Sequence, residues 1–329
     1  MEYRMKLHEN QGLFADAIIA ASRPKGEGGL GIKSIFIEKD YWICRSLSLL
    51  ATADTDNLAV FKGGTSLSKA YGIGHRFSED IDIAISEAWM LNGNQLKNLI
   101  RTLLAKMTQG LTEISIPGLT SKGSNYRKVY FSYPRAVHVQ QVSAITPGQL
   151  LIEINAFANP YPYSKRSISS FLTEFLLQTN NESLIKEYEM APFDINVLDF
   201  KRTLTEKIVS LLRCSFSEYN LQELKAKIRH FYDLHYILRN DEAKEYVKSP
   251  QFITELSQLF AQDQQRFDKP AGWQQLQINQ SILLSKWHDL WQQLRETYQT
   301  ELPDISYQQV PSPEEIEHSI QTLFDLINQ

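Results

Sequence analysis

The chain has 329 residues, of which 43% are hydrophobic and 22% are charged, and its formal net charge is −4. This length buries a large core and suits two domains better than one, and the composition is ordinary for a globular protein. The weakly acidic balance excludes a protein that attracts nucleic acid through its bulk charge. Any contact with RNA or DNA must therefore use a local basic patch.

The two cysteines, Cys44 and Cys214, lie far apart in apolar, helix-like contexts. Their spacing fits neither a metal site nor a disulfide framework, so we expect buried thiols in a reducing compartment. The N-terminal residues lack the apolar region of a signal peptide, and no stretch approaches the roughly 20 apolar residues of a membrane span. These features predict a cytoplasmic protein without membrane contact.

The N-terminal part of the chain predicts two helices, over residues 12–21 and 35–50, separated by a glycine-rich loop over residues 23–31. The loop contains a literal G-x-G-x-x-G, but no strand precedes it, so we interpret it as a flexible loop rather than a dinucleotide site. In the second helix Ile43, Leu47 and Leu50 form a buried stripe. Taken alone, the charged residues 38–40 are typical of a solvated first turn.

Residues 58–85 predict a strand over 58–61, a turn at Gly63 and Gly64, a helix over 66–71 and a strand over 80–85. In the second strand the apolar and acidic residues alternate. Because successive strand side chains point to opposite faces, Asp80 and Asp82 share one face, and three isoleucines share the other. The isoleucine face predicts a core, and the two carboxylates are expected to point outward together.

Two carboxylates held this close repel each other unless a cation lies between them, and hard oxygen ligands favour Mg²⁺ or Mn²⁺. Gly63 and Gly64 let the backbone approach a ligand, and the amides at the following helix start can bind phosphate oxygens. Thr65 or Ser66 can add a hydroxyl. An Asp-x-Asp pair alone is more often a solvated strand end, and Gly-Gly alone a simple turn, but their order here favours a metal–nucleotide site.

The following residues predict a helix over 92–107, a loop over 117–125, strands over 128–133 and 149–157, and a loop over 160–170. Basic and tyrosine residues interleave in the first of these strands and around it. Such a stripe is compatible with a two-faced hairpin or with polynucleotide contact. Its members are Lys122, Tyr126, Arg127, Lys128, Tyr130, Tyr133 and Arg135.

From residue 201 onward the chain predicts helices almost throughout, which places a domain boundary within residues 190–200. Lys207 lies at the margin of an apolar stripe, where a lysine usually keeps its charged end in solvent. Asp233 is surrounded by apolar residues and, if buried, needs a partner. Arg229, one turn earlier, and Lys207 are the two candidates. Further core helices are expected around residues 252–260, 283–294 and 316–327.

Two segments, residues 62–69 (Lys-Gly-Gly-Thr-Ser-Leu-Ser-Lys) and 76–82 (Arg-Phe-Ser-Glu-Asp-Ile-Asp), resemble the first motif of the AbiEii/AbiGii toxin family of nucleotidyltransferases. Residues 37–41 are similar to the family's entry helix, and residues 205–208 and the segment around Asp233 resemble two of its helical motifs. The resemblance implies an α+β, polymerase-β-like fold. A nucleotidyltransferase domain with a small mixed or antiparallel sheet flanked by helices is expected over residues 1–195. A helical domain that completes the active site is expected over residues 196–329.

The resemblance also implies the roles of individual residues. Glu153 is expected to lie on a strand beside the aspartate pair and to complete a metal site with Asp80 and Asp82. Catalytic roles are implied for Asp80, Asp82, Lys207 and Asp233, with Lys207 and Asp233 paired and facing the nucleotide. Contacts with the nucleotide are implied for Lys62, Gly63, Gly64, Thr65, Ser66, Arg76, Ser78 and Lys207.

The expected reaction is transfer of a nucleoside monophosphate from a nucleoside triphosphate to an acceptor hydroxyl, with Mg²⁺ or Mn²⁺ bound and pyrophosphate leaving. The resemblance further implies the toxin of a toxin–antitoxin or phage-defence system, with a cognate antitoxin encoded nearby. The 3′ end of tRNA is the expected acceptor. The alternatives are nucleotidylation of a protein at Ser, Thr or Tyr, and a nucleotide-binding regulator without turnover.

Overall fold

The computed structural model describes residues 5–137, 145–157 and 159–328, and the chain divides into two compact units. Unit 1 comprises the residues up to Gly72 together with Phe77–Leu198. Unit 2 comprises Ile73–Arg76 and the chain from Asp199 onward. The main boundary between the two units thus lies between Leu198 and Asp199, three residues after the boundary that the sequence predicted at residue 195. None of the helices described is long and apolar enough to cross a membrane.

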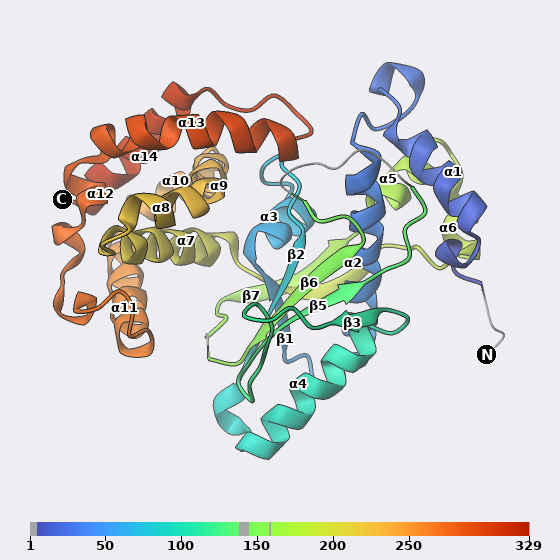
Figure 1. Cartoon of the computed structure of the whole chain (residues 1–329), viewed down its shortest axis with the longest axis horizontal. Helices are drawn as coiled ribbons and strands as arrows, with labels where there is room; N and C mark the ends of the chain where they lie inside the picture. The colour runs from blue at the N-terminus through green and yellow to red at the C-terminus, as the bar shows by residue number, and fades with distance from the viewer. Residues whose placement is uncertain (1–4, 138–144, 158, 329) are drawn as a thin grey trace. The chain divides into compact units, whose positions relative to one another are not determined.

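Unit 1 is built on a mixed sheet, eight-stranded over the residues described, which bears out the expected α+β class (Figure 1). The strand order is β3-β5-β6-β2-β1-β8-β7, and β4 pairs with β5. β2 lies at the centre, antiparallel to β1 and parallel to β6. The strands are β1 (Ala59–Lys62), β2 (Asp80–Ile85), β3 (Thr112–Ile114), β4 (Ser121–Lys122), β5 (Tyr126–Ser132), β6 (Gln149–Asn155), β7 (Tyr163–Ile168) and β8 (Phe193–Leu198).

Two loop predictions about this sheet were wrong, because residues 160–170 contain β7 and residues 117–125 contain the two-residue strand β4. β7 pairs antiparallel with β8 and forms an edge of the sheet. Four consecutive residues of β7 are exposed, so the strand shows no alternation of apolar and polar side chains. Its backbone pairing with β8, rather than burial, holds it in the sheet, and the sequence carries no sign of that pairing.

Helix α2 runs alongside the sheet and contacts the helices α1, α4 and α5 (Figure 1). Ile43, Leu47 and Leu50 are buried on α2, as predicted. The solvated turn expected at residues 38–40 is wrong, because all three charged side chains are buried. The helices are α1 (Gln11–Ser22), α2 (Ser34–Ala53), α3 (Gly63–Tyr71), α4 (Gly93–Met107), α5 (Phe171–Gln178) and α6 (Glu182–Glu187), with 3₁₀ turns at Leu7–Glu9, Lys25–Glu27 and Ala88–Met90.

The named elements of unit 2, over the residues described, are all helices, and they pack around a core rich in aromatic side chains. Trp287 and Trp291 lie one turn apart with ring centroids 5.2 Å from each other. The helix expected over residues 283–294 is divided at Lys286 into two. The helices are α7 (Phe200–Ser215), α8 (Asn220–Ala226), α9 (Ile228–Leu238), α10 (Asp241–Val247), α11 (Pro250–Arg266), α12 (Ile282–Ser285), α13 (Trp287–Ile305) and α14 (Pro313–Ile327), with 3₁₀ turns at Trp273–Gln275 and Ile278–Gln280.

Both cysteines are buried free thiols, as predicted, one in each unit. Burial raises the pKa of the Cys214 thiol to about 11 and that of the Cys44 thiol further still. Neither thiol ionises near neutral pH, so both act as small apolar side chains.

Candidate active site

The central strand β2 places its two aspartates as the alternation predicts. Ile81 and Ile83 are fully buried on one face, whereas Asp80 and Asp82 are only partly buried. Because β2 lies between β1 and β6, its backbone is hydrogen-bonded on both sides. The aspartates therefore stand on a rigid support, which a site needs if it is to hold its groups in fixed positions.

The register of the three central strands aligns three of the predicted site residues in one row. Asp82 lies opposite Lys62 of β1 on one side and opposite Glu153 of β6 on the other. Residues directly opposite in neighbouring strands point to the same face and lie within interaction distance. The row Lys62–Asp82–Glu153 thus brings one cation and two carboxylates to the face of the sheet that carries Asp80.

Gly63 follows Lys62 directly and is the first residue of helix α3. The helix begins at Gly63, three residues earlier than the sequence predicted. The φ angle of Gly63 is +81°, and a Cβ atom added there would lie 2.2 Å from Oδ2 of Asp82. A side chain at this position would displace the carboxylate, so glycine is required for both the backbone conformation and the position of Asp82.

The hydroxyl groups of Thr65 and Ser66 both donate hydrogen bonds to backbone carbonyl oxygens. Thr65 donates from Oγ1 to the carbonyl oxygen of Asp80 at 2.6 Å, and Ser66 donates to the carbonyl oxygen of Gly63 at 2.9 Å. Both side chains are buried. Thr65 thereby ties α3 to the start of β2, whereas Ser66 bonds within the first turn of α3. The backbone amides of Gly64 and its neighbours belong to a helix N-terminus that has no side-chain cap, an arrangement suited to binding phosphate oxygens.

Glu153 has two partners on the neighbouring strand β5. Tyr126 donates from its hydroxyl to Oε2 at 2.9 Å, and Nζ of Lys128 lies 2.8 Å from Oε1. Partial burial lowers the pKa of Lys128, but its bond to the Glu153 carboxylate outweighs this and raises the pKa overall. Each carboxylate oxygen of Glu153 thus already has a donor.

Three further members of the basic and tyrosine stripe are buried or paired locally. Lys122 pairs with Glu113 at 2.5 Å, Tyr133 is buried, and Arg135 donates to the carbonyl oxygen of Val137. These contacts, with those of Tyr126 and Lys128, favour the interpretation of this segment as a two-faced hairpin.

The carboxylates on this face of the sheet supply only part of a binding site for a divalent cation. Asp80 and Asp82 supply the hard carboxylate oxygens that Mg²⁺ and Mn²⁺ prefer, and Gly63 leaves room beside Asp82. Among the residues that the structure describes, no group of three His, Cys, Asp or Glu side chains is close enough to hold a metal ion. The aspartate pair therefore suits a metal as it stands, and Glu153 can join only by exchanging its bonds to Tyr126 and Lys128.

Unit 2 contains a separate buried ionic cluster centred on Asp233. Arg76 binds both carboxylate oxygens, with Nε and an Nη atom each at 2.7 Å, and Nζ of Lys207 lies 2.7 Å from Oδ2. The structure thus contains the predicted Lys207–Asp233 pair and adds Arg76, which the sequence assigned to the nucleotide. Ser78, assigned to the nucleotide as well, lies partly buried in unit 1, in the segment that leads into β2.

The charges within this cluster fix its protonation states. Burial alone raises the pKa of Asp233, but Arg76 and Lys207 outweigh it and hold that pKa well below its usual range. Burial lowers the pKa of Lys207, and Asp233 opposes that shift. The carboxylate is therefore ionised at neutral pH and is a poor proton acceptor, which suits it to orienting the two cations.

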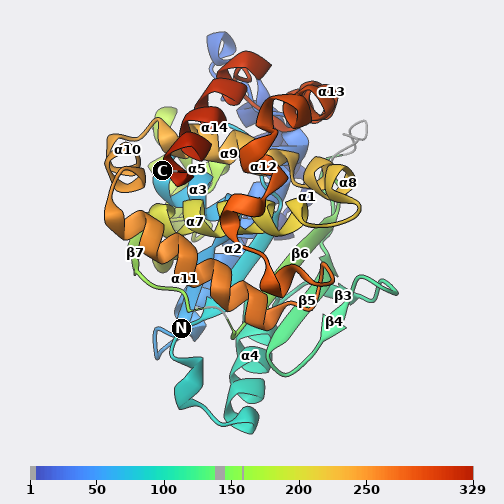
Figure 2. The same ribbon diagram turned by 90° about the vertical axis from the view of Figure 1, so that its left-hand side faces the viewer.

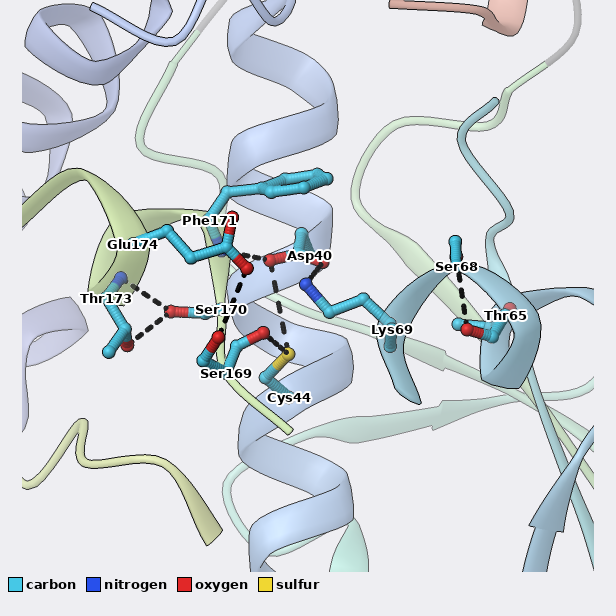
Figure 3. Close-up of polar contacts among 10 residues, drawn as sticks. All are labelled: Asp40, Cys44, Thr65, Ser68, Lys69, Ser169, Ser170, Phe171, Thr173 and Glu174. Atoms are coloured by element: carbon cyan, nitrogen blue, oxygen red, sulfur yellow. Dashed lines mark hydrogen bonds and ion pairs between the residues drawn. The ribbon is translucent and has the colours of Figure 1, made fainter. Parts of the chain in front are cut away.

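A second buried network, not expected from the sequence, fixes α3 within unit 1 (Figure 3). Lys69 of α3 reaches Asp40 of α2, with Nζ 2.7 Å from Oδ1, and lies 4.3 Å from the centre of the Phe171 ring. The other oxygen of Asp40 accepts a hydrogen bond from the Phe171 amide at 2.6 Å. In the sequence, the one feature that pointed to this network was the run of charged residues 38–40 beside the apolar stripe of the same helix.

The two residues before Asp40 extend this network. Lys39 forms an ion pair with Glu79, the residue directly before β2, and Glu38 accepts a hydrogen bond from the Ala136 amide. Both Lys39 and Glu38 are almost fully buried. Asp40 therefore holds α3 and the start of α5, Lys39 holds the residue before β2, and Glu38 holds the segment that follows β5.

Comparison with known proteins identifies the fold and a family. The family model "Nucleotidyl transferase AbiEii toxin, Type IV TA system" matches residues 45–324. No curated protein matches the chain significantly. The nucleotidyltransferase toxin MenT4 from Mycobacterium tuberculosis has a similar structure, with a TM-score of 0.52 and 14% sequence identity, covering 97% of this chain and 89% of MenT4. JHP933 from Helicobacter pylori matches with a TM-score of 0.46 and 16% identity, covering 90% of this chain and 93% of JHP933.

Proposed function

The chain belongs to the AbiEii family of nucleotidyltransferase toxins from type IV toxin–antitoxin systems, and from this premise we propose that it transfers a nucleoside monophosphate to the 3′ end of tRNA with Mg²⁺ or Mn²⁺ bound. A nucleoside triphosphate is the donor, and pyrophosphate is the leaving product. A cognate antitoxin is the partner that such a system implies. We place the reaction in the cytoplasm, where tRNA is found.

The observation that carries this proposal is the position of Asp82 within the sheet. It shares a face with Asp80, lies opposite Lys62 and Glu153, and borders a glycine whose Cβ would collide with its carboxylate. A purely structural pair of surface aspartates does not require this close approach of a helix N-terminus. A phosphate group next to a cation requires both features.

Different residues of the chain would bind different parts of the triphosphate and its cation. A divalent ion bound to Asp80 and Asp82 would neutralise phosphate charge and stabilise the entering and leaving oxygens. The amides of Gly64 and its neighbours at the start of α3 would bind phosphate oxygens. The acceptor hydroxyl would lose its proton to solvent, and its oxygen would form a bond to the α-phosphorus as the bond to the leaving pyrophosphate breaks. We propose Glu153 as a third ligand that enters when Lys128 and Tyr126 move away from it.

Lys207 and Asp233 retain their proposed roles in nucleotide binding. Lys207 carries positive charge for the triphosphate, and Asp233 orients it rather than accepting a proton. The low pKa of Asp233 supports the orienting role, since a carboxylate held so firmly in its ionised form is a weak base.

The test is transfer of label from each of the four α-labelled nucleoside triphosphates, with Mg²⁺, into total RNA and into cell protein. We expect label in the tRNA fraction from the wild-type protein and no label from Asp82→Asn. Asp56→Asn, which removes an exposed carboxylate of the same unit, is the matched control and should retain activity. Label on protein would instead favour protein nucleotidylation, and label on RNA with Asp82→Asn equal to wild type would overturn the proposed site.

A further inference from the structure

Unit 2 has a hollow of about 640 Å³ between the end of α7, the helix α8 and the segment that follows α11. α7 packs against both α8 and α11 (Figure 2). Among the described residues that line the hollow are four cations, Arg213, Lys227, Arg266 and Lys269, against two carboxylates, Glu223 and Asp268. Because the whole chain carries a net charge of −4, this surface is a local exception to the charge balance.

One of these cations is fixed in position. Arg213 pairs with Asp263 at 3.2 Å, and its guanidinium group lies 3.9 Å from the centre of the Phe267 ring. An arginine held by a carboxylate and an aromatic ring loses little further freedom when it binds a ligand. Arg266 and Lys269 are exposed, so their charges are accessible from solvent.

Lys227 lines the hollow and also lies within electrostatic range of the buried cluster around Lys207. Burial lowers the pKa of His230 strongly, and the charges of Lys207 and Lys227 lower it further. Lys227, which lines the hollow, is therefore close enough to act electrostatically on the same residues as Lys207. Lys227 is thus the residue that connects the hollow with the surroundings of Lys207 within unit 2.

An exposed aromatic side chain lies one helical turn before Glu223, a residue that lines the hollow. Tyr219, with 68% of its surface exposed, precedes α8 directly. Its carbonyl oxygen accepts a hydrogen bond from the amide of Glu223, which joins Tyr219 to the first turn of α8. A large exposed ring beside a cluster of cations is the combination by which proteins stack a base and neutralise its phosphate.

We propose that this hollow binds the acceptor RNA, with its cations on successive phosphates and Tyr219 stacked on a base. This inference rests on the proposed function, because it gives the binding site of the acceptor RNA used in that reaction. An acidic protein would also be attracted to the cations, but it offers no planar base for Tyr219. The hollow is also large enough for a nucleotide unit, within the range of about 300–1,000 Å³ of ligand sites.

The experiment measures the affinity of a fluorescent tRNA for the protein at several salt concentrations between about 50 and 200 mM. The hollow variant is Arg266→Gln with Lys269→Gln, and the control is Lys244→Gln with Lys248→Gln, which removes two exposed cations elsewhere in unit 2. We expect the hollow variant to bind roughly tenfold more weakly at the highest salt concentration. The magnitude of the slope of log affinity against log salt should fall by roughly 1.4 to 1.8, as for two lost phosphate contacts. The control should match the wild type.

The stacking contact has its own pair of variants. Tyr219→Leu should weaken binding by roughly tenfold, whereas Tyr219→Phe should bind as the wild type does, because phenylalanine keeps the ring. Circular dichroism spectra of all variants establish that they are folded.

The outcomes separate this inference from the proposed function. If the wild type labels tRNA but the hollow variant binds it as tightly as the control does, the hollow is not the RNA site and the proposed function stands. If the wild type neither binds nor labels tRNA, both fail. If the hollow variant loses affinity for polyglutamate in the same proportion as for tRNA, and Tyr219→Leu changes neither, the surface serves an acidic protein and the RNA inference is overturned.

Discussion

Asp82 of β2 lies directly opposite Glu153 of β6 in a parallel pair of strands, although 71 positions of sequence separate them. Lys128, opposite Glu153 on the other side, balances one of the two negative charges. The row therefore holds carboxylates close together while Lys128 and Tyr126 bind the second of them. Displacing those two donors frees Glu153 for another cation.

This arrangement predicts the effect of removing the Glu153 carboxylate. Glu153→Gln should raise the Mg²⁺ concentration for half-maximal transfer by roughly tenfold or more, because the metal loses a ligand while Asp80 and Asp82 remain. The measurement is a Mg²⁺ titration of labelled nucleotide transfer. Glu113→Gln removes a carboxylate paired with a lysine in the same sheet and is the control. An unchanged Mg²⁺ requirement in Glu153→Gln would show that Glu153 serves only the hairpin.

A second prediction concerns Gly63. Gly63→Ala should lower the transfer rate by about 100-fold, since the added Cβ displaces the Asp82 carboxylate and misplacement of a reacting group by about 1 Å has such an effect. Gly110 has a similar φ of +87° but no atom within 4 Å of an added Cβ. Gly110→Ala therefore carries the same backbone strain of roughly 1–2 kcal/mol without the collision. The rates and the unfolding free energies of both variants distinguish the two effects, and equal loss of rate would refute the collision.

The sequence predicted the positions of the site residues where a local pattern carried the information. Period-two alternation placed Asp80 and Asp82 on one face, and the apolar surroundings of Asp233 required a partner. Residues brought together by long-range pairing carried no such pattern. Arg76 lies 157 positions from Asp233, so no local spacing indicates their double hydrogen bond.

The absence of a local sequence pattern for long-range contacts also explains the wrong predictions about the fold. The charged residues of α2 resemble a solvated turn because their partners, Glu79 and Lys69 among them, come from elements far along the chain. β7 resembles a loop because backbone pairing with β8, and not side-chain burial, keeps it in the sheet. In both cases tertiary contacts override the local preference of the sequence.

The buried pair of Lys69 and Asp40 predicts a large loss of stability on removal of one partner (Figure 3). Lys69→Met should lower the free energy of unfolding by about 3–5 kcal/mol, because it leaves the Asp40 carboxylate buried without its cation. The measurement is equilibrium unfolding in urea. Lys122→Met removes a lysine from an exposed pair and should cost no more than about 1 kcal/mol. Similar losses in the two variants would contradict the assigned role of the buried pair.

The depressed pKa of Asp233 predicts how its contribution to stability depends on pH. Because the folded protein holds this pKa below the unfolded value of about 3.9, the carboxylate stabilises the fold fully above that value and progressively less as the pH falls towards the folded pKa. The difference in unfolding free energy between the wild type and Asp233→Asn should thus be constant from about pH 5 to 7 and narrow below about pH 4. Urea unfolding at a series of pH values measures this difference, and Asp241→Asn, which removes an exposed aspartate of the same unit, is the control. A difference that stays constant down to pH 3 would contradict the ionised Asp233 at the centre of the cluster, and with it the role of Asp233 in orienting Lys207.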